Sequence, residues 1–286
     1  MTQLLLISLL LLSNIENNTQ IVETKTIVYP IQIGQTKSDT LLIGIQNKIY
    51  KTFIQDLMSK DKKSLSKSNL ALEKLKLALE KLRLAPEKPN LYLAELNKQK
   101  IQNLIIYWES YLQFYSSIYY LKKGDKETAE KEIDKGINCL KEIKNKNSED
   151  YALLSMIQGF SMQFKGQKAM FISEEIKENL KRAIALDSRN LRAYYVYASN
   201  DFYTPQEYGG GKETESYLLK AISLPVQKIK KEYLPSWGKE EAFGILIKFY
   251  IKNESWDRAK KYFKEGIKLY PQSYTINQLE RELAGK

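Results

Sequence analysis

The sequence contains no histidine and only one cysteine, Cys139. Without histidine the chain has no imidazole metal ligand and no serine–histidine or cysteine–histidine nucleophile pair. It also lacks the side chain that most often acts as a general acid or base. A single cysteine excludes an intrachain disulfide framework, a CxxC redox pair and a zinc site made of thiolates. These absences point away from an enzyme. The sequence therefore predicts no catalytic residue, no bound metal and no cofactor.

Arginine is also scarce, although the chain of 286 residues is basic, with a net charge of +11. Six of its 45 basic residues are arginines and the other 39 are lysines. A basic chain can attract nucleic acid or an anionic membrane, but bidentate recognition of phosphates and bases favours the planar arginine fork. The lysines are interspersed with glutamates, as in residues 122–146. This pattern is typical of a solvated surface, and we expect no specific nucleic-acid partner.

Long apolar runs are missing, apart from Leu4 to Leu12, which only Ser8 interrupts. A helix that spans a bilayer needs roughly 20 apolar residues, so this run predicts no integral membrane span. It fits the apolar region of a secretory signal, which predicts a signal peptide over residues 1–20 and a periplasmic or secreted protein. No basic residue precedes the run and no small-x-small cleavage site follows it. A buried N-terminal segment of a cytoplasmic protein stays open as the alternative.

Helical periodicity dominates the rest of the chain, so we expect an all-α fold. Residues 26–33 alternate weakly, and a short extended or irregular lead-in is predicted over residues 21–37. Residues 38–105 predict a divergent helical region, in which Pro86 ends a leucine-rich segment. From residue 106 onward helix, short turn and helix alternate at regular spacing. Several of these helices are too short to be stable alone, so they are expected to stack on their neighbours.

The clearest repeated unit covers residues 240–274. Large residues recur in its first helix, small and large residues alternate in its second, and a proline follows: Phe243, Leu246 and Tyr250, then Ala259, Phe263 and Gly266, then Pro271. This spacing resembles the tetratricopeptide repeat, a helix pair of about 34 residues. One position departs from the pattern, because Ile247 stands where a small residue usually lets the two helices approach. Gly244, three residues earlier, is the candidate substitute.

Weaker copies of the unit precede it at about 106–147, 148–189 and 190–225, and a C-terminal capping helix follows. Their second helices carry Ala129, Ala183 and Ala221 at the small position. Two copies are longer than the unit, with additions at residues 165–173 and 200–212. The resemblance implies a right-handed α-solenoid of stacked antiparallel helix pairs, with the additions projecting from its edge.

The second addition, residues 200–211, is similar to the glycine-rich turn of tetratricopeptide proteins from bacterial periplasmic transport, including the T-component of TRAP transporters. Its GGG run precedes a helix, whose N-terminal amides could attract an anion. A turn that permits close helix approach is the alternative interpretation. The similarity covers this one segment.

In the family that the repeats resemble, set positions of each first helix line a concave face. Tyrosines and arginine near residue 200 also suit a recognition surface, although tyrosines equally pack between helices. Together these arguments give the candidate partner-binding residues Arg192, Tyr195, Ser199, Phe202, Tyr203, Tyr208, Glu241, Lys248 and Ile251. We predict a non-catalytic scaffold that binds a protein or peptide partner. A small-molecule-binding accessory of a transport system is the alternative, and an enclosed apolar cavity would favour it.

Overall fold

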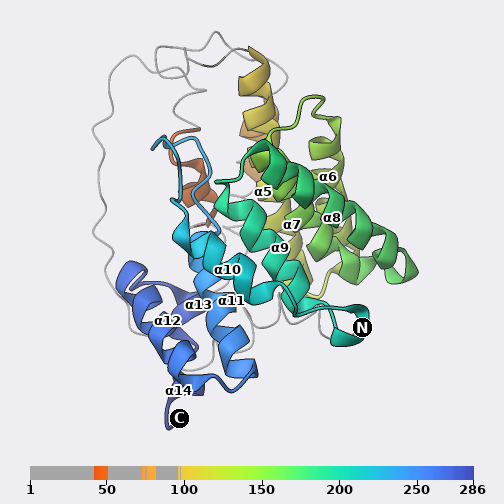
Figure 1. Cartoon of the computed structure of the whole chain (residues 1–286). Coiled ribbons are helices and arrows are strands. Elements are labelled where there is room, and N and C mark those ends of the chain that lie inside the picture. Colours follow the sequence, from red (N-terminus) through yellow and green to blue (C-terminus); the bar gives the residue numbers. More distant parts are fainter. Residues whose placement is uncertain (1–41, 51–72, 75, 82–95, 97) are drawn as a thin grey trace. The chain divides into compact units, whose positions relative to one another are not determined.

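The structure is a computed structural model that describes residues 42–50, 73–74, 76–81, 96 and 98–286 (Figure 1). Within these residues the chain is helical and contains no strand, so the all-α prediction is confirmed for them. The expected signal peptide, the lead-in at 21–37 and most of the region 38–105 lie outside the described residues. No helix in the described part combines the length and apolar character needed to cross a membrane.

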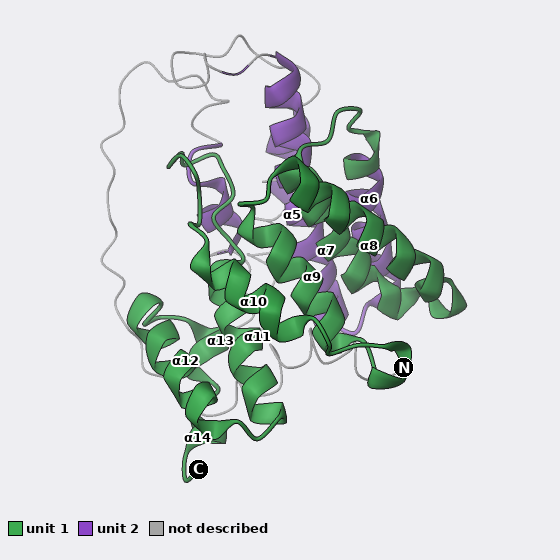
Figure 2. Cartoon of the chain, in the orientation of Figure 1, with its two compact units in different colours: residues 1–7, 140–286 green, residues 8–139 purple. Residues whose placement is uncertain are grey.

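The chain divides into two compact units (Figure 2). One comprises residues 8–139 and includes α5 (Lys98–Lys122) and most of α6 (Lys126–Glu142). Aromatic rings line the buried face of α5, where Trp108 and Tyr111 meet edge to face at 5.5 Å between centroids. The Ser117 hydroxyl donates to the Ala129 carbonyl at 2.6 Å and ties α5 to α6. The predicted repeat boundary at 105/106 falls inside α5, because its apolar pattern continues without a break.

The other unit contains residues 140–286, together with residues 1–7 outside the described part. Its long helices are α7 (Ser148–Ser161), α8 (Ala169–Leu186), α9 (Leu191–Tyr203), α10 (Thr214–Ser223), α11 (Lys239–Lys252) and α12 (Trp256–Leu269). Single turns of 3-10 helix, η2 (Met162–Phe164), η3 (Gly166–Lys168) and η4 (Gln206–Tyr208), lie in the connections. Two four-residue helices, α13 (Tyr274–Asn277) and α14 (Glu280–Leu283), stand where one capping helix is expected.

Successive helices of this unit pack in pairs. α7 contacts α8, α9 contacts α10, and α11 contacts α12. The first helices of the pairs also contact one another, α7 with α9 and α9 with α11. Alanines lie fully buried where α7, α8 and α9 meet, at Ala152, Ala183 and Ala193. Side chains this small let helix backbones approach closely, as the sequence pattern requires.

The unit at 240–274 forms its helix pair as predicted. Tyr250 and Ala259 belong to one buried apolar core, against which the partly buried Phe263 packs, and the Tyr250 ring stacks on Tyr262 at 5.5 Å. All the alanines predicted at the small position are completely buried: Ala129, Ala183, Ala221 and Ala259. Gly244 was expected to let α11 and α12 approach, but the structure shows it next to another helix. A β-carbon there would lie 2.7 Å from Thr275 Cγ2, so the glycine makes room for α13 rather than for α12.

The two additions are more helical than the sequence suggests. α8 begins at Ala169, so half of the segment 165–173 is an extension of that helix. α9 continues to Tyr203, so the segment 200–212 is a turn only from Thr204 onward. The residues that extend the helices, 169–173 and 200–203, contain neither proline nor glycine, and the first proline of the second addition is Pro205.

Candidate partner-binding face

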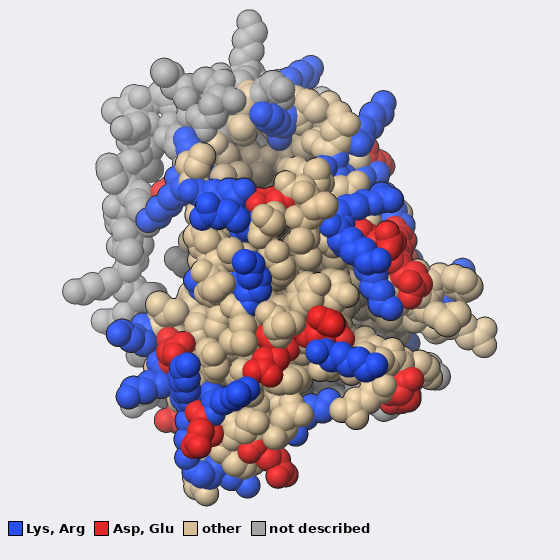
Figure 3. All heavy atoms as spheres, viewed as in Figure 1, with Lys and Arg blue, Asp and Glu red and all other residues tan. Residues whose placement is uncertain are grey.

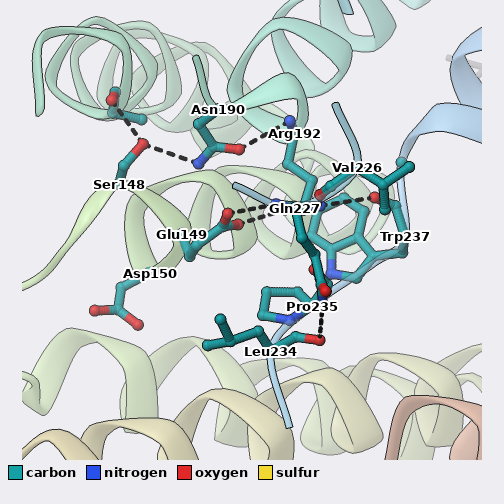
Figure 4. A network of polar contacts seen from close by, with 12 residues as sticks. Ser148, Glu149, Asp150, Asn190, Arg192, Val226, Gln227, Leu234, Pro235 and Trp237 are labelled. Atoms are coloured by element: carbon teal, nitrogen blue, oxygen red, sulfur yellow. Dashed lines mark hydrogen bonds and ion pairs between the residues drawn. The ribbon is translucent and has the colours of Figure 1, made fainter. Parts of the chain in front are cut away.

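Arg192, the first of the predicted binding residues, is buried at the start of α9, with 4% of its surface exposed. Its Nε and Nη2 donate to the two carboxylate oxygens of Glu149, each at 2.5 Å. Its Nη1 donates to the backbone carbonyls of Val226 and Trp237, each at 3.1 Å. Figure 4 shows the guanidinium enclosed by these groups. The structure thus uses Arg192 to join α7, α9 and the loop at 224–238, and does not present it to a partner.

Neighbouring helix starts join the same network. The Asn190 side-chain oxygen accepts from the Arg192 N–H at 2.9 Å and caps α9. Its amide nitrogen donates to the Ser148 hydroxyl at 2.8 Å, and that hydroxyl donates to the Ala183 carbonyl at 2.7 Å. The start of α7, the end of α8 and the start of α9 are therefore fixed to one another (Figure 4).

The loop between α10 and α11 is organised around Gln227. Its amide nitrogen donates to the carbonyls of Lys231, Leu234 and Pro235 at 2.8 to 3.1 Å. Trp237 closes the loop, and its ring meets the Tyr195 ring edge to face at 6.1 Å. Tyr195, the second predicted binding residue, is half-buried under this contact. The loop therefore covers the first turns of α9, where the sequence predicts an open surface.

Glu241 caps α11 through its side chain. Its carboxylate accepts from the Gly238 N–H at 2.7 Å, which satisfies one of the free amides at the helix start. Desolvation raises the pKa of Glu241 to about 7, and the charge of Glu240 adds to this effect. Asp150 has the same role in α7, where it accepts from the Asn147 N–H at 2.9 Å. Burial raises the pKa of Asp150 to about 7 as well.

These two carboxyl groups make stability depend on pH. Each binds its proton more tightly in the folded chain, at a pKa of about 7, than at the ordinary values of 3.8 for Asp150 and 4.5 for Glu241. The free energy of unfolding is therefore expected to fall as the pH rises from 5 to 7 and to level off above that. Urea denaturation at a series of pH values measures this slope.

Glu241→Gln is expected to flatten that slope and to raise the free energy of unfolding at pH 8, because the amide oxygen still accepts from Gly238. Glu265→Gln, at an exposed position of α12, serves as the control and is expected to leave the profile unchanged. An unaltered slope in Glu241→Gln would contradict the assignment.

The tyrosines around α9 mostly pack between helices. Tyr197 stacks on Tyr217 of α10 with ring centroids 4.2 Å apart, and Tyr194 lies 5.7 Å from the same ring. Burial raises the pKa of Tyr203 to about 12. Tyr208 alone among the predicted aromatic binding residues is strongly exposed, at 78%. The tyrosines of α9 thus pack between helices, and Tyr208 is the tyrosine near this helix that a partner can reach.

The glycine-rich turn before α10 is closed by an acidic side chain of its own. One carboxylate oxygen of Asp201 accepts from the Glu213 N–H at 2.9 Å and from the Thr214 hydroxyl at 2.6 Å. The Gly211 N–H donates to the Asp201 carbonyl at 3.0 Å. The Asp201 carboxylate therefore lies at the helix start, where the sequence pattern suggests that an external anion could bind.

Lys248 and Ile251 lie on one face of α11, three residues apart and half-buried. Gly244, one turn before Lys248, lies against Thr275 of α13. The ammonium of Lys252, one turn after Lys248, lies 5.5 Å from the centre of the Phe202 ring of α9. Burial lowers the pKa of Lys248, and the charge of Glu282 opposes this only in part. Lys248 makes no hydrogen bond or ion pair with any residue that the structure describes.

We name the set Ser199, Phe202, Lys248, Ile251 and Lys252 the α9–α11 face. It contains four of the predicted binding residues, which lie in the second halves of α9 and α11, and it adds Lys252.

Sequence reasoning missed Glu149, Trp237 and Gln227, the residues that cover or hold the loop over the first half of α9. No spacing signal points to them, because Glu149 and Trp237 lie 43 and 45 residues from Arg192 along the chain.

The described part of the chain shows no group of three or more cysteine, aspartate or glutamate side chains placed to hold a metal ion. Basic side chains spread over the visible surface with acidic side chains among them (Figure 3). This distribution agrees with a solvated lysine-rich surface.

Comparisons of the chain with protein-family models, with curated proteins and with solved structures found no match.

Proposed function

We propose that residues 140–286 form a tetratricopeptide-like solenoid that binds an extended protein or peptide segment on the α9–α11 face. The contacts of α7 with α9 and of α9 with α11, each first helix backed by its second, support this arrangement. So do the fully buried alanines at the predicted small positions. Non-catalytic binding fits a chain without histidine, in which the perturbed carboxyl groups cap helices.

Lys248 is the observation that carries the proposal. A desolvated ammonium without an ion-pair partner lowers stability, and such groups are retained where a ligand supplies the opposite charge. Apolar contact from Phe202 and Ile251 lies on the same face. The segment that fits this surface therefore carries a carboxylate next to an apolar side chain. A periplasmic or secreted localisation, as the sequence predicts, remains part of this proposal.

Lys248→Met separates binding from folding, because methionine keeps much of the apolar stem and removes the charge. Peptides selected from a random display library against the purified chain are expected to bind the variant at least tenfold more weakly, since a charge-assisted contact is lost. The variant itself is expected to unfold at the same or a higher urea concentration.

Lys264→Met is the matched control, since Lys264 is exposed on α12 and makes no ion pair with a described residue. It is expected to change neither peptide affinity nor stability. Failure of the library to yield any saturable peptide, or equal loss of affinity in both variants, would count against the α9–α11 face as the binding site.

A further inference from the structure

The two additions to the repeats lie at one edge of the unit that contains residues 140–286. A β-carbon at Gly159, near the end of α7, would lie 2.6 Å from the side-chain oxygen of Asn200, near the end of α9. The ends of these two helices are therefore in contact. The connection from α7 to α8 and the connection from α9 to α10 begin next to each other, and Figure 1 shows both on the same side of the unit.

This edge carries the most exposed large apolar side chains in the described part of the chain. Tyr208, in the second connection, is 78% exposed. Phe171 and Met170, in the first turn of α8, are 72% and 68% exposed. Single exposed apolar residues are ordinary on a protein surface, but several of them on one edge indicate an interaction surface.

The packing of α8 does not require Met170 and Phe171. The helix buries Ile176, and steps of four and three residues back along the chain lead from Ile176 to Ile172 and Ala169. Those two residues are half-buried, whereas Met170 and Phe171 lie on the faces of α8 that are turned away from its core. Their apolar character therefore serves no contact within the described part of this helix pair.

The charges of the first connection are all positive. Residues 151–173 contain no aspartate or glutamate, and their two charged residues are Lys165 and Lys168. Lys168 is exposed, and its side chain makes no hydrogen bond or ion pair with any residue that the structure describes. In the second connection, residues 204–212, one glutamate and one lysine balance each other. The edge therefore combines projecting apolar side chains with a net positive charge.

A bilayer that contains anionic lipids offers the complement of this combination. A projecting phenylalanine or methionine enters the boundary between headgroups and acyl chains without a matching pocket, and tyrosine suits the headgroup level. Lysines next to the inserted side chains are attracted to the negative lipid surface. A protein partner would instead have to supply an apolar pocket for each projecting side chain and acidic groups beside it. The lipid surface meets both needs at once.

We propose that this edge docks the protein on an anionic membrane surface. Phe171 and Met170 insert at the boundary of the acyl chains, Tyr208 lies among the headgroups, and Lys165 and Lys168 contact lipid phosphates. This is attachment to one face of a bilayer and involves no spanning helix. The edge is separate from the α9–α11 face, so the proposal does not depend on the protein partner proposed there.

Sedimentation of the whole chain with lipid vesicles tests the docking. The chain is expected to bind vesicles of phosphatidylcholine and phosphatidylglycerol saturably, and to bind pure phosphatidylcholine at least tenfold more weakly. Met170→Ser combined with Phe171→Ser is expected to weaken binding to the anionic vesicles at least tenfold, because apolar burial is lost. Lys168→Glu is expected to weaken it severalfold. Circular dichroism melts of both variants are expected to match the parent chain, since the replaced side chains are exposed.

Two controls carry the same changes away from the edge. Leu186→Ser replaces a side chain that is 58% exposed at the other end of α8, and Lys144→Glu replaces an exposed lysine before α7. Both are expected to bind like the parent chain. If the double serine variant does not fold, Lys168→Glu and the quenching measurement below carry the test.

The depth of position 171 distinguishes insertion from a general attraction of a basic chain to anionic lipid. Phe171→Trp is expected to lose fluorescence on anionic vesicles with brominated acyl chains, beyond the loss in the parent chain, whereas Leu186→Trp is not. The apolar run at residues 4–12 is present in every variant, so the difference between the two positions reports on the edge. Equal quenching at both positions, unchanged affinity in the folded serine variant, or a chain that binds neither kind of vesicle and so leaves the edge to a protein partner, would overturn the proposal.

Discussion

Arg192→Ala is expected to lower the free energy of unfolding by about 3–5 kcal/mol, because it breaks a buried ion pair by removing one partner. The substitution removes both contacts to the Glu149 carboxylate and both contacts to the carbonyls of Val226 and Trp237. The Glu149 charge is then left partly buried without its partner, and the loop at 224–238 loses its attachment to α9. Urea denaturation followed by circular dichroism measures the loss.

Two further variants distinguish a buried ion pair from a general effect of removing arginine. Arg189→Ala, at an exposed position three residues earlier, is expected to change stability by less than about 0.5 kcal/mol. Glu149→Gln combined with Arg192→Ala is expected to be less destabilising than the sum of the single changes, because the two side chains interact directly. A loss below about 1 kcal/mol in Arg192→Ala would show that the network contributes little.

Much of the fold could be predicted from the sequence, because helix packing depends on residues at fixed spacing. The pattern of Tyr250, Ala259 and Phe263 predicted a helix pair, and in the structure Tyr250 and Ala259 lie in one core with Phe263 packed against it. The alanine at the small position of each copy is fully buried for the same reason. Local signals of this kind report how one helix meets its neighbours in sequence order.

The candidate sites depend on contacts that such spacing does not contain. The register rule placed Arg192 on a concave face, but it could not show that Glu149 and the loop at 224–238 would enclose it. The loop lies outside the repeated unit, so no repeat position describes it.

The sequence of an insertion also does not show which other residues of the chain will contact it. The segment 200–212 suggested a projecting loop that could shape a ligand site. In the structure Asp201 binds the start of α10 and closes the turn from inside. The Glu213 amide at that helix start therefore already binds a carboxylate of the chain itself, which weakens the chemical argument for an external anion at this turn.

Gly210→Ala is expected to destabilise the chain by about 3 kcal/mol, at the upper end of the usual range for overpacking. A β-carbon at Gly210 would lie 1.9 Å from the Thr204 carbonyl oxygen, which belongs to the backbone and cannot rotate away. The Gly210 N–H also donates to the Pro205 carbonyl at 3.2 Å, so the turn has little freedom to shift. Relief of the clash requires the turn to open, which would disturb the attachment of α10 through Asp201.

Gly211→Ala is the matched control at the next residue. Gly211 has a φ of +84°, and a β-carbon there meets nothing within 4 Å. Its substitution is expected to cost only the strain of a left-handed backbone, about 1–2 kcal/mol. Thermal melts of the two variants compare a steric clash with backbone strain in the same turn. If Gly211→Ala proved the more harmful of the two, the close approach of Thr204 to Gly210 would not be what holds this turn in shape.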